Sequence, residues 1–313
     1  MKGVKIIAEV LLLLVVLTGA AFLIEKKYEK AGTTADQIFD NYALYKNDSI
    51  TVILGSSHAL MLDDYYPDTS EYVVNFSIGG QDLFRENMVL RKILKDGAKV
   101  KRVVLALDYD ALGYNQVLSG EGYIDKQYYR YLDTLYDNSL ANQLMGSSSF
   151  FRCNRDISYL FSDVEEGAKP VKAKGGQASQ IPYIPVGTGA LNTEDCKRRA
   201  IEHSSIKFKK NLLLENIQNL KEIIQACSSR NIELVVITTP KMKCYCEASN
   251  QENISLAKLK IDSLFSAEGK KVERFDFYAD STFSEKDFID YDHLNQIGVK
   301  KLYQKLNAIF VKN

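Results

Sequence analysis

Thr51-Val-Ile-Leu-Gly55-Ser56-Ser57-His58 is the stretch that decides the predicted fold. Its β-branched and aliphatic residues predict a buried strand over 50–55, which stops abruptly at a glycine and two hydroxyl side chains. In open α/β sheets, ligands bind at the carboxyl ends of the strands. The stretch therefore predicts a strand that delivers a small polar side chain to a binding edge.

The rest of the chain alternates between strand-like and helix-like patterns, after a short connector helix expected at 33–47. Further strands are predicted at 71–77, 100–107, 232–239 and 272–277, and amphipathic helices at 81–96, 206–229, 254–265 and 294–310. Strands that alternate with helices in this way predict an α/β fold, in which a parallel sheet carries helices on both faces.

Residues 111–200 break this alternation. They are rich in tyrosine and contain a Gly-Ser stretch, Gly146–Ser149, and a polar stretch, Gly167–Gln180. We expect an insertion that serves as a lid or substrate platform. The tyrosines fit stacking on sugars, but Tyr is equally ordinary in a protein core. The expected division is a membrane anchor at 1–30, an α/β domain formed by 31–110 and 201–313, and the insertion at 111–200.

The N-terminal segment is apolar from 6 to 24, apart from Glu9. A helix of that length covers about 30 Å, the thickness of one hydrocarbon core. Lys2 and Lys5 precede it, which predicts a single-pass anchor with the bulk of the chain outside the cytoplasm. A cleaved signal peptide, cut near Gly19–Ala21, is the alternative. Either one predicts an exported domain.

Composition narrows the function classes. Hydrophobic residues make up 46% of the chain and aromatics 11%, enough for a substantial core. The formal net charge is zero and no basic block stands out, so we expect no nucleic-acid partner.

The five cysteines are an odd number, so at least one thiol has no partner within the chain. A disulfide between Cys153 and Cys196 is our expectation. Cys244-Tyr245-Cys246 lacks the four ligands at recognisable spacing that thiolate metal sites use. We therefore expect no metal and no cofactor.

A second stretch, Asp290-Tyr291-Asp292-His293, lies near the other end of the chain. A serine after a strand, with Asp-x-x-His far downstream, is the pattern of a nucleophile with its base and orienting carboxylate. We expect His58 to point away from its neighbour Ser57, and His203 to be a solvated surface residue. His293 remains as the base, with Asp290 as its orienting carboxylate and Asp292 as the fallback.

These motifs resemble those of the SGNH (GDSL-like) hydrolases. Gly55-Ser56-Ser57 corresponds to the family's Gly-Asp-Ser block, and Asp290 and His293 correspond to its Asp-x-x-His block. The resemblance implies a three-layer, flavodoxin-like α/β/α fold with Ser57 as nucleophile. It also implies an oxyanion hole formed by the amides of Ser57 and Gly80, with Gly79 as the near alternative.

One family block is missing. The family places an Asn in Gly-x-Asn-Asp after the third strand, where this chain has Leu107-Asp108-Tyr109-Asp110; Gly113-Tyr114-Asn115 comes several residues too late. An ionised Asp108 would repel an oxyanion instead of donating to it. Loss of one such donor typically costs about 10²–10³-fold in rate. Asp108, His58 and Asp292 are expected to line the site.

The Gly-Ser-Ser-His form behind an anchor most resembles the cell-surface branch of the family, which is linked to O-acylation of polysaccharides and teichoic acids. The resemblance implies an extracytoplasmic serine O-acyl esterase or acyltransferase, with acetyl as the expected group. Its partners would be an acylated cell-surface glycan and a membrane-bound O-acyltransferase. A catalytically inactive glycan-binding or acyltransferase-partner protein is one alternative, and a lipid esterase is another.

Overall fold

The computed structural model describes residues 2–63, 66, 71–116, 118, 123–132, 140–153, 192–204, 210–267 and 272–310. The chain forms two compact units. One comprises 1–37 and 125–169, and the other comprises 38–124 and 170–313. The second unit carries the sheet.

A parallel sheet of five strands forms the centre of this larger unit. Its strands are β1 (Ser49–Leu54), β2 (Tyr72–Asn75), β3 (Lys99–Ala106), β4 (Glu233–Thr238) and β5 (Val272–Asp276). They lie in the order β2-β1-β3-β4-β5, which is the flavodoxin-like order. Val52 pairs with Val74 on one side and with Val103 on the other. The predicted α/β fold with a parallel sheet is confirmed.

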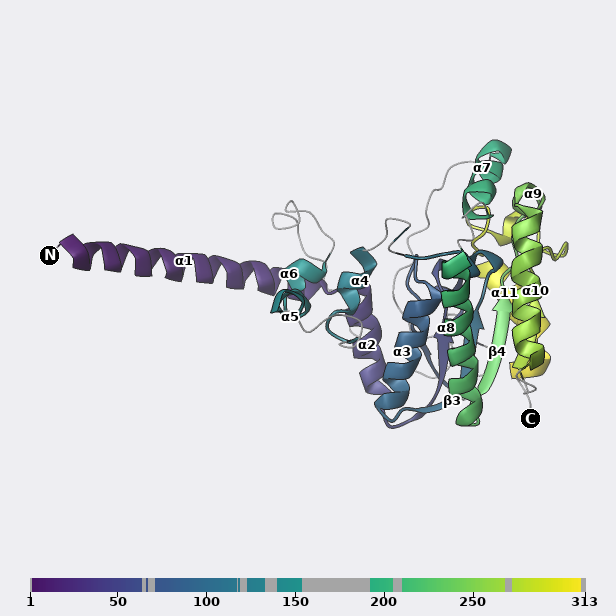
Figure 1. Ribbon diagram of the computed structural model, residues 1–313, viewed down its shortest axis with the longest axis horizontal. Helices are drawn as coiled ribbons and strands as arrows, with labels where there is room; N and C mark the ends of the chain where they lie inside the picture. The colour runs from purple at the N-terminus through teal and green to yellow at the C-terminus, as the bar shows by residue number, and fades with distance from the viewer. Residues whose placement is uncertain are drawn as a thin grey trace. The chain divides into compact units, whose positions relative to one another are not determined.

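Helices cover both faces of the sheet. Those of the described chain in this unit are α3 (Leu83–Lys95), α7 (Thr193–Ser204), α8 (Lys210–Ser229), α9 (Lys243–Ala248), α10 (Gln251–Ala267) and α11 (Gln296–Phe310), and α2 (Thr34–Leu44) runs across the division between the units. α3 and α8 pack together on one side (Figure 1). On one face of the sheet, the apolar side of α11 packs into a cluster with alternate strand residues, which include Ile53, Val104, Val235, Val299, Leu302 and Leu306.

Two helices and one disulfide depart from the sequence-based expectations. α7 and α9 were not predicted, and a disulfide joins them through Cys196 and Cys244, whose Cα atoms are 6.2 Å apart. The expected Cys153–Cys196 bond is therefore wrong. Cys153 is a buried cysteine of the smaller unit that forms no disulfide, and its Sγ lies 3.4 Å from the carbonyl oxygen of Gly32. Spacing along the chain carries no information on which cysteines packing brings together.

The smaller unit is built around α1 (Lys2–Ala31), with α5 (Leu140–Ser147) and α6 (Ser149–Arg152); α4 (Tyr123–Tyr128) runs across the division. The span Val4–Lys30 of α1 has a hydropathy of 2.7, and its most apolar stretch of 18 residues is not buried against the protein. The helix is thus long and apolar enough to span a membrane, a test that a signal sequence also passes.

The described helices of the expected insertion belong to different units. α5 and α6 belong to the smaller unit, whereas α7 belongs to the sheet-bearing unit. Gly167–Gln180 lies outside the described residues. A lid or substrate platform therefore stays a prediction.

Candidate active site

Ser57 lies just beyond the carboxyl end of β1, in a short 3₁₀ turn over Ser57–Ala59. Gly55 makes this turn possible, since its φ of 151° is one that side-chain-bearing residues rarely adopt. A Cβ on Gly55 would also lie 2.7 Å from the Cβ of Ala59 and 3.0 Å from that of Ala106. The apolar strand thus ends in a tight turn, which places Ser57 at the carboxyl edge of the sheet.

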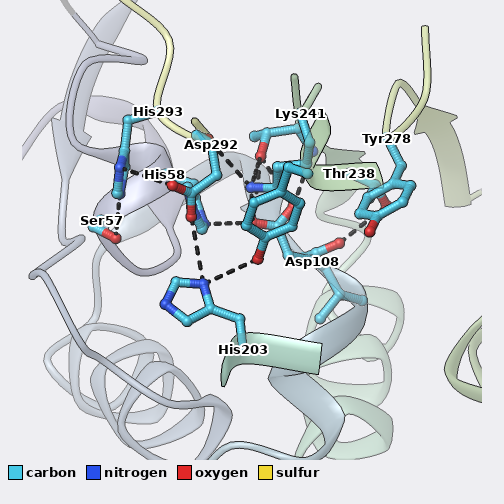
Figure 2. Close-up of polar contacts among 12 residues, drawn as sticks. Ser57, His58, Asp108, His203, Thr238, Lys241, Tyr278, Asp292 and His293 are labelled. Carbon is cyan, nitrogen blue, oxygen red and sulfur yellow. Dashed lines mark hydrogen bonds and ion pairs between the residues drawn. The ribbon is translucent and has the colours of Figure 1, made fainter. Parts of the chain in front are cut away.

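Ser57, His293 and Asp290 form one hydrogen-bonded line. His293 Nε2 lies 2.8 Å from Ser57 Oγ (Figure 2), and His293 Nδ1 lies 2.9 Å from Asp290 Oδ2. The backbone N–H of His293 also donates to Asp290 Oδ1, at 2.8 Å. Both Asp290 and His293 are buried. The Asp-x-x-His spacing lets one turn hold the imidazole by its ring and by its own backbone.

Backbone N–H groups face the same region. Within the described part of the chain, the N–H groups of Ser57 and Gly80 donate to no protein acceptor. Gly80 has φ 73° in a turn closed by Gln81 N–H and the Ile78 carbonyl, at 3.0 Å. A Cβ on the preceding Gly79 would lie 3.9 Å from that of Ser57, so the turn lies beside the serine.

His58 does not point away from the site as expected. Its ring stacks on His293, with centroids 4.5 Å apart and planes 28° apart. The strand has already ended at this point, so neighbouring side chains no longer alternate between opposite faces. His58 Nε2 lies 3.0 Å from Asp292 Oδ2, and Nδ1 lies 2.5 Å from Asp108 Oδ2 (Figure 2).

A carboxylate at each ring nitrogen favours the doubly protonated imidazolium of His58. Burial and the Lys241 cation lower the pKa of this ring, but Asp108 and Asp292 outweigh them and raise it to about 9. His58 is therefore a cation at neutral pH, stacked against His293.

Asp108, which follows β3, is held by ion pairs with Lys241 and His58. Lys241 Nζ donates to its Oδ2 at 2.9 Å, and the N–H and hydroxyl of Thr239 donate to its Oδ1 at 3.1 and 2.9 Å. Burial raises the pKa of this carboxyl, but Lys241 and His58 bring it well below its usual range. The carboxylate is thus ionised, and its charge is compensated by two cations.

Asp292 forms the other side of the charged cluster. Its side chain is fully buried; Arg199 Nε donates to Oδ1 at 2.6 Å, and His203 Nδ1 lies 3.5 Å from Oδ2. Its partners His58, His203 and the neighbouring His293 overcome burial and hold its pKa well below the usual range. The charges of this cluster balance, because three carboxylates, Asp108, Asp290 and Asp292, lie against three cations, His58, Arg199 and Lys241.

Helix α7 brings residues to the site that the sequence did not reveal. Arg199 and His203 are four positions apart and share one helix face. The prediction that His203 is a solvated surface residue is wrong: its side chain is 31% exposed and its Nδ1 lies 3.0 Å from the Tyr245 hydroxyl. α7 is joined to α9 by the disulfide, which keeps this face turned inward. Lys241 was also missed, although it follows closely after the predicted strand 232–239.

The base candidate His293 has a lowered pKa. Burial is the main cause and the adjacent His58 cation is the second, opposed by Asp292 and Asp290. His293 is therefore neutral at neutral pH; its Nδ1–H donates to Asp290, and the lone pair of Nε2 accepts from the Ser57 hydroxyl.

One atom cluster has metal-like spacing. Ligand atoms of His58, Asp292 and His293 all lie within 4.8 Å of one another. A doubly protonated His58 offers no lone pair, however, and the cations Arg199 and Lys241 are direct neighbours. The chemistry of this cluster suits an ion-pair network better than a metal site.

Comparisons with known proteins add little to this geometry. No family model matches the chain, and no curated protein matches it. A solved structure from Streptococcus pneumonia, provisionally described as a platelet activating factor, is similar over 96% of this chain and 98% of its own. The identity is 14% and the TM-score 0.41. Similarity at this level does not establish a shared activity.

Proposed function

We propose that the protein is a membrane-anchored, extracytoplasmic serine esterase or O-acyltransferase that acts on a cell-surface polysaccharide. The observation that carries this proposal is the continuous line from Ser57 Oγ to His293 Nε2 at 2.8 Å, and from His293 Nδ1 to Asp290 at 2.9 Å. Nucleophile, base and orienting carboxylate are thus within hydrogen-bond reach of one another before any substrate binds.

In the proposed reaction, Ser57 Oγ attacks an ester carbonyl while its proton passes to His293 Nε2. Asp290 keeps the imidazole in the tautomer that accepts this proton and stabilises the imidazolium. The tetrahedral intermediate then expels the alcohol, which takes the proton back from His293, and an acyl-Ser57 remains. Water, or a sugar hydroxyl, attacks the acyl group in the second half.

The free N–H groups of Ser57 and Gly80 are the proposed oxyanion donors. No side-chain amide stands at Asp108, so we expect a slower esterase than one with three donors. Because Lys241 and His58 compensate the Asp108 charge, the carboxylate adds little net repulsion. This supports an active enzyme over the catalytically inactive alternative.

His58 is proposed as a positioning residue for His293. Its stacked cation disfavours a second positive charge on His293, so the base remains neutral in mildly acidic surroundings. The same repulsion makes the transient His293 imidazolium a better acid for the leaving alcohol.

α1 and the resemblance support the proposed location and substrate. An apolar helix at the start of the chain suits retention at a membrane, where a membrane-bound O-acyltransferase could supply acyl groups. The glycan and the acyl donor are proposals that rest on the Gly-Ser-Ser-His form and not on a contact in the structure.

Two measurements test the proposal. Purified protein should hydrolyse short acetyl esters in preference to long acyl chromogenic esters; the reverse preference would favour a lipid esterase. Cells that carry Ser57→Ala should show an altered O-acetyl content of the surface polysaccharide. Unchanged acylation together with intact glycan binding would favour the inactive alternative.

A further inference from the structure

The junction between α1 and α6 lies at the edge of the apolar run. Glu25 is the first residue after the run that ends at Ile24, and its carboxylate accepts a hydrogen bond from the Ser148 hydroxyl at 2.7 Å. It also accepts from the backbone N–H of Ser149, and from that of Phe150 at 3.3 Å. One carboxylate therefore holds the first turn of α6 against α1.

These contacts fix the position of α6 along the axis of α1. Each residue of a helix advances about 1.5 Å along its axis, so Glu25 lies directly beside the last apolar residue. Helical side chains also tilt toward the N-terminus, which here is the apolar side. At the other end of α6, Cys153 Sγ contacts the carbonyl of Gly32, about two turns further along. The first residues of α6 therefore lie nearer to the apolar segment of α1 than its last residues do.

Two aromatic side chains stand at that level. Phe150 packs edge-on against the buried Tyr28 ring, with centroids 5.1 Å apart, and Phe151 packs on Phe150 at 5.3 Å. Phe150 remains 36% exposed and Phe151 53% exposed. Adjacent exposed rings cost free energy in water, whereas the bilayer interface accommodates aromatic side chains well.

We propose that Phe150 and Phe151 form a membrane-contact surface that rests in the interface of the bilayer from which α1 emerges. The occupant is lipid, because Glu25, the residue that follows the apolar run of α1, holds this surface at the end of that run. The inference rests on the membrane anchoring in the proposed function but not on the esterase activity. In this proposal the smaller unit contacts the membrane surface and holds α1 at a fixed depth in the bilayer.

The chain has no tryptophan, so single Trp substitutions report depth without background. Full-length Phe151→Trp is reconstituted into vesicles of phospholipids brominated either near the headgroup or near the chain end. Two reference variants are matched to it: Leu14→Trp in the middle of the apolar run, and Leu259→Trp at a 64% exposed position of α10.

We expect Phe151→Trp to have blue-shifted emission and to lose more emission with shallow bromines than with deep ones. Leu14→Trp should show the opposite depth preference, and Leu259→Trp should be quenched by neither. If Phe151→Trp behaves like Leu259→Trp while Leu14→Trp is quenched, lipid is not the occupant and the proposal fails. If Leu14→Trp is also unquenched, the anchor is absent from the bilayer and the proposal fails with it.

Labelling of Ser57 by a fluorophosphonate on the same samples separates the two proposals. Retained labelling with no shallow quenching overturns only the membrane contact. Shallow quenching without labelling supports the membrane contact and counts against the esterase.

Discussion

The Ser57–His293 side of the site and the Asp108–Lys241 side lie next to each other but are built in different ways. Ser57, His293 and Asp290 come from two short segments, and each makes the contact that its motif predicts. The residues of the charged cluster come instead from the carboxyl ends of β1, β3 and β4, from α7, and from the segment between β5 and α11 that contains Asp292. The comparison teaches that short motifs place the reacting groups, whereas the packing of distant segments sets their protonation.

Removal of the nucleophile is expected to have the largest effect. Ser57→Ala should lower kcat/KM for an acetyl ester by about 10⁴–10⁶-fold, since it removes the hydroxyl that lies 2.8 Å from His293 Nε2. The matched control is Ser56→Ala, whose side chain makes no capping hydrogen bond and should leave turnover within about threefold of the parent. Equal losses in both variants would contradict the assignment of Ser57.

Removal of one cation from the charged cluster should lower the stability of the folded protein. Lys241→Met leaves the buried Asp108 with one cation fewer, and it should lower the free energy of unfolding by about 3–5 kcal/mol. Adding Asp108→Asn should restore at least half of this loss, because the uncompensated charge disappears. Chemical unfolding in detergent, followed by circular dichroism, measures both.

Lys243→Met is the control for that pair, since Lys243 is exposed and should change stability by less than about 0.5 kcal/mol. A double variant no more stable than Lys241→Met alone would show that Asp108 and Lys241 are not energetically coupled.

Loss of the disulfide should lower the free energy of unfolding somewhat less than Lys241→Met does. Replacing Cys196 and Cys244 by Ser opens a covalent loop of 48 residues and should cost about 2–4 kcal/mol. Because α7 carries Arg199 and His203, ester turnover should fall as well. Cys246→Ser, which removes a free thiol, is the control. Alkylation of Cys196 or Cys244 in the unreduced, denatured parent would contradict the bond.

The smallest expected change is a shift in pH dependence. Burial and the His58 cation lower the pKa of His293, so its neutral, basic form should persist below the ordinary histidine value of 6.5. The acid limb of kcat/KM against pH should therefore lie below 6.5 in the parent. His58→Gln removes the positive neighbour, raises the pKa of His293 and should move that limb to higher pH.

His203→Gln, which does not stack on His293, should shift the limb less than His58→Gln. Titration of the His293 ring by NMR gives the same quantity without substrate. An unmoved or lowered His293 pKa in the His58→Gln protein would remove His58 from its proposed role.

The centre of the sheet was predictable because β1 and β4 are apolar runs that are followed by small or polar residues. β1 and β4 are buried along nearly their whole length, so the pattern of the sequence follows that of the structure directly. α7 gave no such signal. It buries only Cys196, Ala200 and Ser204, and a polar helix held by a disulfide has no apolar periodicity to detect.

The residues of the candidate site likewise fall into those that the sequence predicted and those that it did not. The sequence indicated Ser57, His293 and Asp290 because their spacing is itself a motif. Arg199 and Lys241 are single charges in polar surroundings, and only the folded chain brings them to Asp292 and Asp108. His58 was misplaced because strand alternation was extended past Leu54, where the strand ends.

The most direct test of the catalytic assignment is covalent labelling of the folded, full-length protein with a fluorophosphonate, followed by peptide mapping. The proposed line from Ser57 to His293 to Asp290 predicts one phosphonyl adduct, on Ser57, which is lost in His293→Ala as well as in Ser57→Ala. Well-folded parent protein that takes up no label, or that takes it up on another serine, would contradict the account.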